Sequence, residues 1–131
     1  MATTLKQMIE EANAVVPRIP PEKARQMIEA GDVLLVDVRD APEVEATGIA
    51  KGAIHVSRGM LEFRADPESP MHRQEFMREK PVIVYCASGG RAALAGKTLR
   101  DLGFREVYNM GAFKDWVEAG GEVERPVEPG M

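Results

Sequence analysis

Short apolar runs alternate along this chain with stretches whose apolar residues recur at helical spacing. Residues 33–38 and 82–85 are almost wholly apolar and rich in β-branched residues or leucine. Runs of this length and composition predict strands that are covered on both faces of a sheet. Two shorter runs, residues 53–56 and 107–110, predict an edge strand and a further strand, with Gly111 turning the chain after the second.

The segments between these runs have the spacing of amphipathic helices. Apolar residues recur every three or four positions in residues 22–30, 92–102 and 113–117. Gly31 and Gly103 follow two of these stretches and are typical helix stop signals. Because strands alternate with helices, the chain is predicted to be an α/β protein with a mostly parallel central sheet.

The first apolar stripe, formed by Leu5, Met8, Ile9 and Ala12, predicts a short helix that Pro17 ends. Such a stripe packs either on its own domain or on a second subunit, and we favour the first interpretation. The oligomeric state is therefore open, with a homodimer as one alternative. We expect three parts: an N-terminal helical extension (1–16), a main domain (17–124) and a polar tail (125–131).

Composition narrows the classes of function. The 131 residues suffice for one domain with a real core, and the net charge of −4 argues against a general nucleic-acid-binding surface. No apolar run approaches the ~18 residues of a membrane span, and the first residues lack the uninterrupted core of a signal peptide. We therefore expect a cytoplasmic protein without a membrane partner.

The single cysteine, Cys86, stands at the carboxyl end of the predicted strand 82–85. One cysteine excludes an internal disulfide and leaves two roles, an inert buried thiol or a reactive one. The five residues that follow are small or polar and end in an arginine: Ala87, Ser88, Gly89, Gly90 and Arg91. A loop of this kind before a helix can turn several N–H groups inward and so favours a thiolate or another anion.

Two other kinds of site are less consistent with the residues. Gly96-Lys97-Thr98 matches the end of a nucleotide-binding P-loop, but Arg91 stands where that motif needs a glycine. The two histidines, His55 and His72, have no further ligands near them in the sequence, so no metal site is expected. Asp37 and Arg39, at the end of the first buried strand, belong either to the mouth of a site or to a structural ion pair.

Several motifs, taken in order, resemble the rhodanese-like sulfurtransferases with a single domain. They are VDVRD (36–40), GAIHV (52–56), VYCASGGRAALA (84–95), LGF…VYNMGAF (102–113) and the closing DWVEAGG, and they cover residues 18–123. The resemblance implies a three-layer rhodanese fold, in which a five-stranded, mostly parallel sheet is flanked by helices on both sides.

The resemblance also implies a mechanism without a cofactor or metal. Cys86 would take a sulfane sulfur from thiosulfate or a similar anionic donor, become a persulfide, and pass the outer sulfur to a thiol or cyanide acceptor. The backbone of residues 87–91 would cradle the persulfide, Arg91 would assist the donor, and Asp37 and Arg39 would support the site. A sulfur-relay protein is a further partner that the family suggests.

Two alternatives share this fold. A persulfide carrier or sulfur sensor would need the same cysteine without turnover. Related dual-specificity phosphatases of the cell-cycle type place one more residue between cysteine and arginine and have histidine before the cysteine, whereas here Tyr85 precedes a C-x4-R loop.

The chain also departs from the family's usual GHIPGA, since Gly48 and Lys51 replace its histidine and proline. Arg58 and Arg64, in a predicted rim loop, are read as solvated surface residues.

Overall fold

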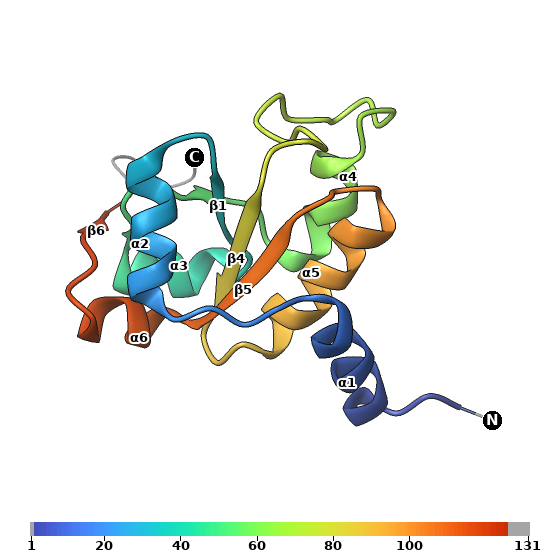
Figure 1. Cartoon of the computed structure of the whole chain (residues 1–131), viewed down its shortest axis with the longest axis horizontal. Coiled ribbons are helices and arrows are strands. Elements are labelled where there is room, and N and C mark those ends of the chain that lie inside the picture. Colours follow the sequence, from blue (N-terminus) through green and yellow to red (C-terminus); the bar gives the residue numbers. More distant parts are fainter. Residues whose placement is uncertain (1, 126–131) are drawn as a thin grey trace.

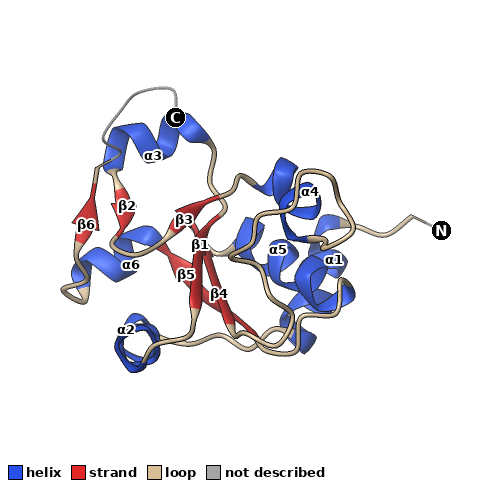
Figure 2. Cartoon of the chain, turned by 90° about the horizontal axis from the view of Figure 1, so that it is seen from above, coloured by secondary structure: helices blue, strands red, loops and turns tan. Residues whose placement is uncertain are grey.

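A computed structural model describes residues 2–125, so the predicted tail lies outside the described residues except for residue 125. Four parallel strands form the central sheet in the order β3-β1-β4-β5. Figure 1 labels β1, β4 and β5, and Figure 2 labels β3 as well. Their bounds are β1 (Leu34–Asp37), β3 (Ile54–His55), β4 (Val82–Cys86) and β5 (Val107–Ala112). The edge position of β3 and the parallel sheet agree with the sequence prediction.

The fifth strand expected from the resemblance is reduced to one bridge, between Arg18 and Asn109 on the outer edge of β5. Pro17 and Pro20 flank this segment, and proline has no N–H to donate to a ladder. Only the Pro17 carbonyl and the Ile19 N–H therefore pair with β5, both through Asn109.

Helices cover both faces of the sheet, so the predicted three-layer α/β architecture is confirmed (Figure 2). One face carries α1 (Leu5–Val15), α4 (Leu61–Ala65) and α5 (Gly90–Asp101); the other carries α2 (Pro21–Ala30) and α6 (Phe113–Glu118). A 3-10 turn, η1 (Arg58–Met60), leads into α4, and α3 (Ala41–Thr47) follows β1. No helix within residues 2–125 is long and apolar enough to span a membrane.

The alternation of side chains along β4 divides the core in two. Val82, Val84 and Cys86 join the cluster beneath α5, whereas Ile83 and Tyr85 join the cluster beneath α2 and α6. Every β4 residue is buried, as expected for a central parallel strand. This period of two places Cys86 directly beside the helix that follows it.

Strand β5 differs from the prediction at its end, because it continues through Gly111 to Ala112. The register with β4 shifts there: Val84 faces Asn109, and Tyr85 faces Gly111. Gly111 has φ +90°, so the chain bulges at this residue without leaving the sheet.

A second, two-stranded antiparallel sheet was not predicted. It consists of β2 (Ile49–Ala50) and β6 (Val123–Glu124). Gly48, with φ +84°, ends α3 here, and a Cβ at this position would lie 2.7 Å from the Val123 side chain and 2.8 Å from the Glu124 carbonyl oxygen. Lys51 forms an exposed ion pair with Glu122, 3.1 Å long. Both departures from the family motif therefore belong to this small sheet.

Helix α1 packs on α5 through Ala12 and Val16, which are buried, while Leu5 and Met8 remain exposed. The sequence prediction that the whole stripe packs on its own domain therefore holds only for its C-terminal half. Gly96 lies inside α5, and a Cβ there would be 2.8 Å from a methyl carbon of Val16. Close approach of α1 thus explains this glycine.

Replacing Gly96 with alanine should destabilise the protein by about 1 kcal/mol. Alanine favours a helix over glycine by about 1 kcal/mol, but overpacking a core contact costs about 1–3 kcal/mol. The free energy of unfolding in urea measures the net effect. Adding Val16→Ala makes room for the new methyl group. The double variant should therefore lose less free energy of unfolding than the two single variants lose in sum. Simple additivity would contradict a contact between residues 96 and 16.

Candidate functional site

Cys86 ends β4, and its thiol is enclosed by the loop that leads into α5. The side chain is fully buried. The backbone N–H of Gly89 donates to its Sγ at 3.0 Å, and that of Ala92 donates at 3.4 Å. Gly89 has φ +104°, a left-handed conformation that turns its N–H toward the sulfur. The loop therefore presents main-chain donors to an anionic sulfur at the start of a helix.

The outer part of the loop is open, since Ala87 and Ser88 are exposed, while Gly89 is buried against β5. Asn109, a buried residue of β5, braces the loop from below: its Nδ2 donates to the Gly89 carbonyl at 3.1 Å. Its Oδ1 accepts from the Gly111 N–H at 2.8 Å. Sequence reasoning missed Asn109, although a lone amide inside the apolar run 107–110 was the available signal.

Arg91 closes the loop, and its guanidinium is held by a carboxylate from α3. Nη1 donates to Glu43 Oε2 at 2.7 Å and Nη2 donates to Oε1 at 2.9 Å, a bidentate pair. Glu43 Oε2 also accepts from the Asp40 N–H, completing a capping box at the start of α3. Glu43 was missed as well; the spacing Asp40-x-x-Glu43 predicts the cap, but nothing local predicts the contact with Arg91.

The Glu43 carboxyl should titrate near pH 2. Its hydrogen bonds with Arg91 lower its pKa from 4.5 to about 2. Because the pKa of Glu43 is lowered, its pair with Arg91 stabilises the folded protein fully above about pH 4.5, and this stabilisation is lost as the pH falls toward 2. Both side chains are 35% exposed, so the pair contributes only about 0–1 kcal/mol. Carbon-detected NMR titration measures the midpoint, and Arg91→Gln should move it upward; an unchanged midpoint would contradict the assignment.

Asp37 and Arg39 form a buried ion pair at the end of β1. Their exposed fractions are 0% and 2%, and the shortest contact, Arg39 Nη2 to Asp37 Oδ2, is 2.7 Å. The remaining guanidinium donors reach Thr47 Oγ1 and the Gly48 carbonyl, both at 2.8 Å. The guanidinium carbon lies 4.3 Å from the centre of the Phe113 ring. The pair thereby ties β1 to the end of α3 and to α6.

Tyr85 and His55 belong to the same frame. The Tyr85 hydroxyl oxygen accepts from the Ala50 N–H at 3.0 Å, which joins β2 to the central sheet. Burial, and then the charge of Asp37, raises the pKa of this hydroxyl. His55 Nε2 lies 2.7 Å from the Arg39 carbonyl oxygen. These contacts join the elements around the site, and within the described residues neither side chain is hydrogen-bonded to the loop of residues 87–91.

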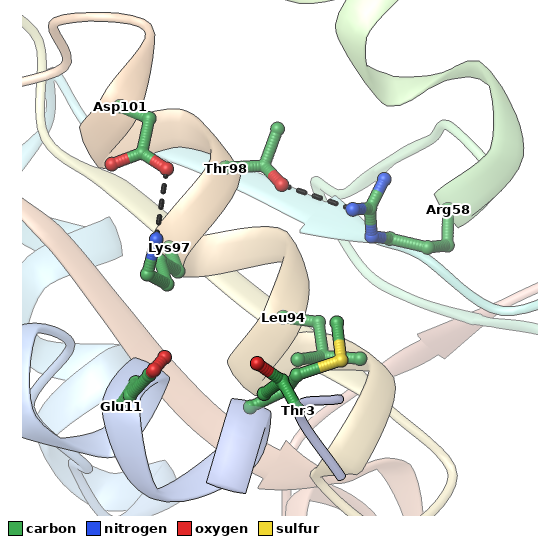
Figure 3. Close-up of a pocket in the computed structure, with 8 residues that line it drawn as sticks. Thr3, Glu11, Arg58, Leu94, Lys97, Thr98 and Asp101 are labelled. Carbon is green, nitrogen blue, oxygen red and sulfur yellow. Dashed lines mark hydrogen bonds and ion pairs between the residues drawn. The ribbon is translucent and has the colours of Figure 1, made fainter. Parts of the chain in front are cut away.

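A hollow of about 350 Å³ lies beside the outer face of α5, between α1 and η1 (Figure 3). Arg58, one of its lining residues, points to α5 and donates to Thr98 Oγ1 at 2.9 Å. It also pairs with Glu62 at 3.0 Å. Lys97 pairs with Asp101 at 3.0 Å in the same view. The cations of this hollow are thus matched by carboxylates of their own.

Comparison with known proteins places these features in a family context. Residues 20–119 match the family model described as a rhodanese-like domain. The thiosulfate sulfurtransferase GlpE of Coxiella burnetii is 32% identical over 95 residues, which cover 72% of this chain and 80% of that protein. Among solved structures, the polysulfide-sulfur transferase homodimer of Wolinella succinogenes is 35% identical with a TM-score of 0.73, covering 96% of this chain and 90% of that one.

A further solved structure is similar over almost the whole chain. It is a Rhodopseudomonas palustris protein of unknown function, described as a possible tyrosine phosphatase, with 38% identity and a TM-score of 0.85. It covers 95% of this chain and 96% of its own. The two chains therefore share the fold over nearly their whole lengths.

Proposed function

This chain belongs to the rhodanese-like domain family, and from that premise we propose that it is a sulfurtransferase that carries a sulfane sulfur on Cys86. The relatives named as thiosulfate and polysulfide sulfur transferases support a role in handling sulfur. The observation that carries the proposal is the pair of main-chain N–H donors, from Gly89 and Ala92, directed at Cys86 Sγ.

The proposed reaction has two displacements at sulfur. The Cys86 thiolate attacks the outer sulfur of thiosulfate, the S–S bond of the donor breaks, and its electron pair leaves on sulfite. The product is an anionic persulfide on Cys86, which the N–H groups of the loop stabilise. An acceptor such as cyanide then attacks the outer persulfide sulfur, and the S–S bond breaks back to the thiolate, giving thiocyanate.

The size of the loop favours sulfur transfer over phosphate hydrolysis. Only four residues separate Cys86 from Arg91, and the loop folds so closely that two N–H groups already reach Sγ. Arg91, which a phosphatase would direct at phosphate oxygens, is instead paired through both outer nitrogens with Glu43. This arrangement suits one added sulfur atom better than a tetrahedral phosphate.

Thiosulfate treatment followed by intact-mass measurement tests the proposal. The chain has one cysteine, so a mass gain of one sulfur that is reversed by cyanide, with repeated thiocyanate release, is the expected result. A mass gain without turnover would indicate the carrier alternative. Absence of both, with hydrolysis of an aryl phosphate, would overturn sulfur transfer in favour of a phosphatase.

A further inference from the structure

Three arginines described above are each paired with a carboxylate, including Arg91, which closes the loop of residues 87–91 (the catalytic loop). Arg91 is paired with Glu43, and Arg39 is paired with Asp37. Arg58 is paired with Glu62 and is also hydrogen-bonded to α5. The guanidinium of the loop itself, that of Arg91, therefore meets an anionic sulfur donor with its charge already compensated by Glu43.

Arg18 is the exception. It lies in the extended segment before α2, beside Asn109 of β5, and its side chain is exposed. Its guanidinium lies across two glycines: Nη1 is 3.2 Å from the position that a Cβ would take at Gly89, and Nη2 contacts the corresponding position at Gly111. Within residues 2–125 the Arg18 side chain has no hydrogen bond or ion pair.

This guanidinium lies close to the reactive sulfur. Gly89, which it contacts, is also the residue whose N–H donates to Cys86 Sγ at 3.0 Å. With backbone bonds of about 1.5 Å, the path through Gly89 limits the distance between Arg18 Nη1 and Sγ to about 9 Å. That is within the Debye length of about 10 Å at 0.1 M salt, so the charge acts on an anion at the loop.

We propose that Arg18 is a positioning residue that draws anionic sulfur donors to the catalytic loop. The proposal rests on the proposed sulfurtransferase function for the identity of the donor, but its electrostatic part concerns only the approach of an anion to Cys86. Both glycines have positive φ, +104° and +90°, so the surface on which the guanidinium lies is built for residues without a Cβ.

Alkylation of Cys86 tests the proposal without requiring turnover. Iodoacetate carries a negative charge and iodoacetamide is neutral, and with either reagent the thiolate displaces iodide. Arg18→Gln should lower the rate with iodoacetate relative to iodoacetamide by about 2- to 20-fold, the effect of one unit charge at about 9 Å for a dielectric constant between 80 and 20. Arg18→Lys should restore most of the wild-type ratio of the iodoacetate rate to the iodoacetamide rate. In the wild type, high salt should lower this ratio.

Arg105→Gln is the matched control. Arg105 is also exposed, and it precedes β5, about 20 Å along that strand from Gly111 at 3.3 Å per residue. The Arg105→Gln variant loses the same charge at a position away from the loop. Its ratio of iodoacetate to iodoacetamide rates should therefore stay at the wild-type value. Equal changes in the two variants, or equal slowing with both reagents after Arg18→Gln, would overturn the proposal. So would a wild-type thiol that neither reagent reaches, since an anionic donor could not reach it either.

Thiosulfate kinetics extend the test to the donor. Because thiosulfate is a dianion, Arg18→Gln should reduce kcat/KM by about 5-fold or more, mainly through a higher KM. An unchanged KM with a lower kcat would contradict a role in donor capture. If the wild type has no turnover at all, the function proposed above fails, while the alkylation ratio still decides the role of Arg18.

Discussion

Cys86→Ser is expected to reduce thiocyanate formation from thiosulfate and cyanide by at least about 10³-fold, the scale of loss on removing the nucleophile of a covalent mechanism. A serine hydroxyl stays protonated at neutral pH and cannot form a persulfide. The Gly89 and Ala92 N–H groups can still donate to its oxygen, so the loop should retain its conformation. The change therefore removes chemistry and not the fold.

Ser88→Ala is the control for this experiment. Ser88 lies in the same loop, is exposed, and makes no side-chain hydrogen bond within the described part of the chain. Its activity should stay close to that of the wild type. Circular dichroism and urea unfolding of both variants establish that they are folded. Substantial residual turnover in folded Cys86→Ser would contradict the persulfide mechanism.

The sequence predicted those parts of the site that depend on neighbours in the chain. Four apolar residues, then Cys86, then small residues, then a helical pattern specify a buried strand, a tight loop and a helix start, and the structure has this arrangement. The alternation of β4 side chains also follows from the pattern alone. The family resemblance, which the match over residues 20–119 confirms, added the three-layer fold.

The missed features depend on residues far apart in the sequence. Arg91 meets Glu43, which lies 48 positions away, and Gly89 meets both Asn109 and Arg18 through β5. Hydrophobic periodicity carries no information about such contacts, because it reports only which face of an element is buried. The edge pairing of β2 with β6 escaped prediction for the same reason, since two residues on each side leave almost no pattern.

Asp37→Asn is expected to lower the free energy of unfolding by about 3–5 kcal/mol, the usual loss when one partner of a buried ion pair is removed. Asn keeps the shape of the side chain but leaves the Arg39 charge, 2% exposed, without its carboxylate. For a chain of this size the melting temperature should fall by about 10–20 °C. Urea unfolding and thermal melting measure the two quantities.

Adding Arg39→Met removes the buried charge as well, so the double variant should be more stable than Asp37→Asn alone. Equal or lower stability of the double variant would show that the hydrogen bonds of Arg39 to Thr47 and Gly48 matter more than its charge.

Since those bonds hold the end of α3, their loss should also loosen Glu43 from Arg91. The pKa of Glu43, about 2 in the intact protein, should then rise in the double variant. The buried pair would in that case act through α3 on Arg91 and on the loop of residues 87–91, at a distance from the thiol.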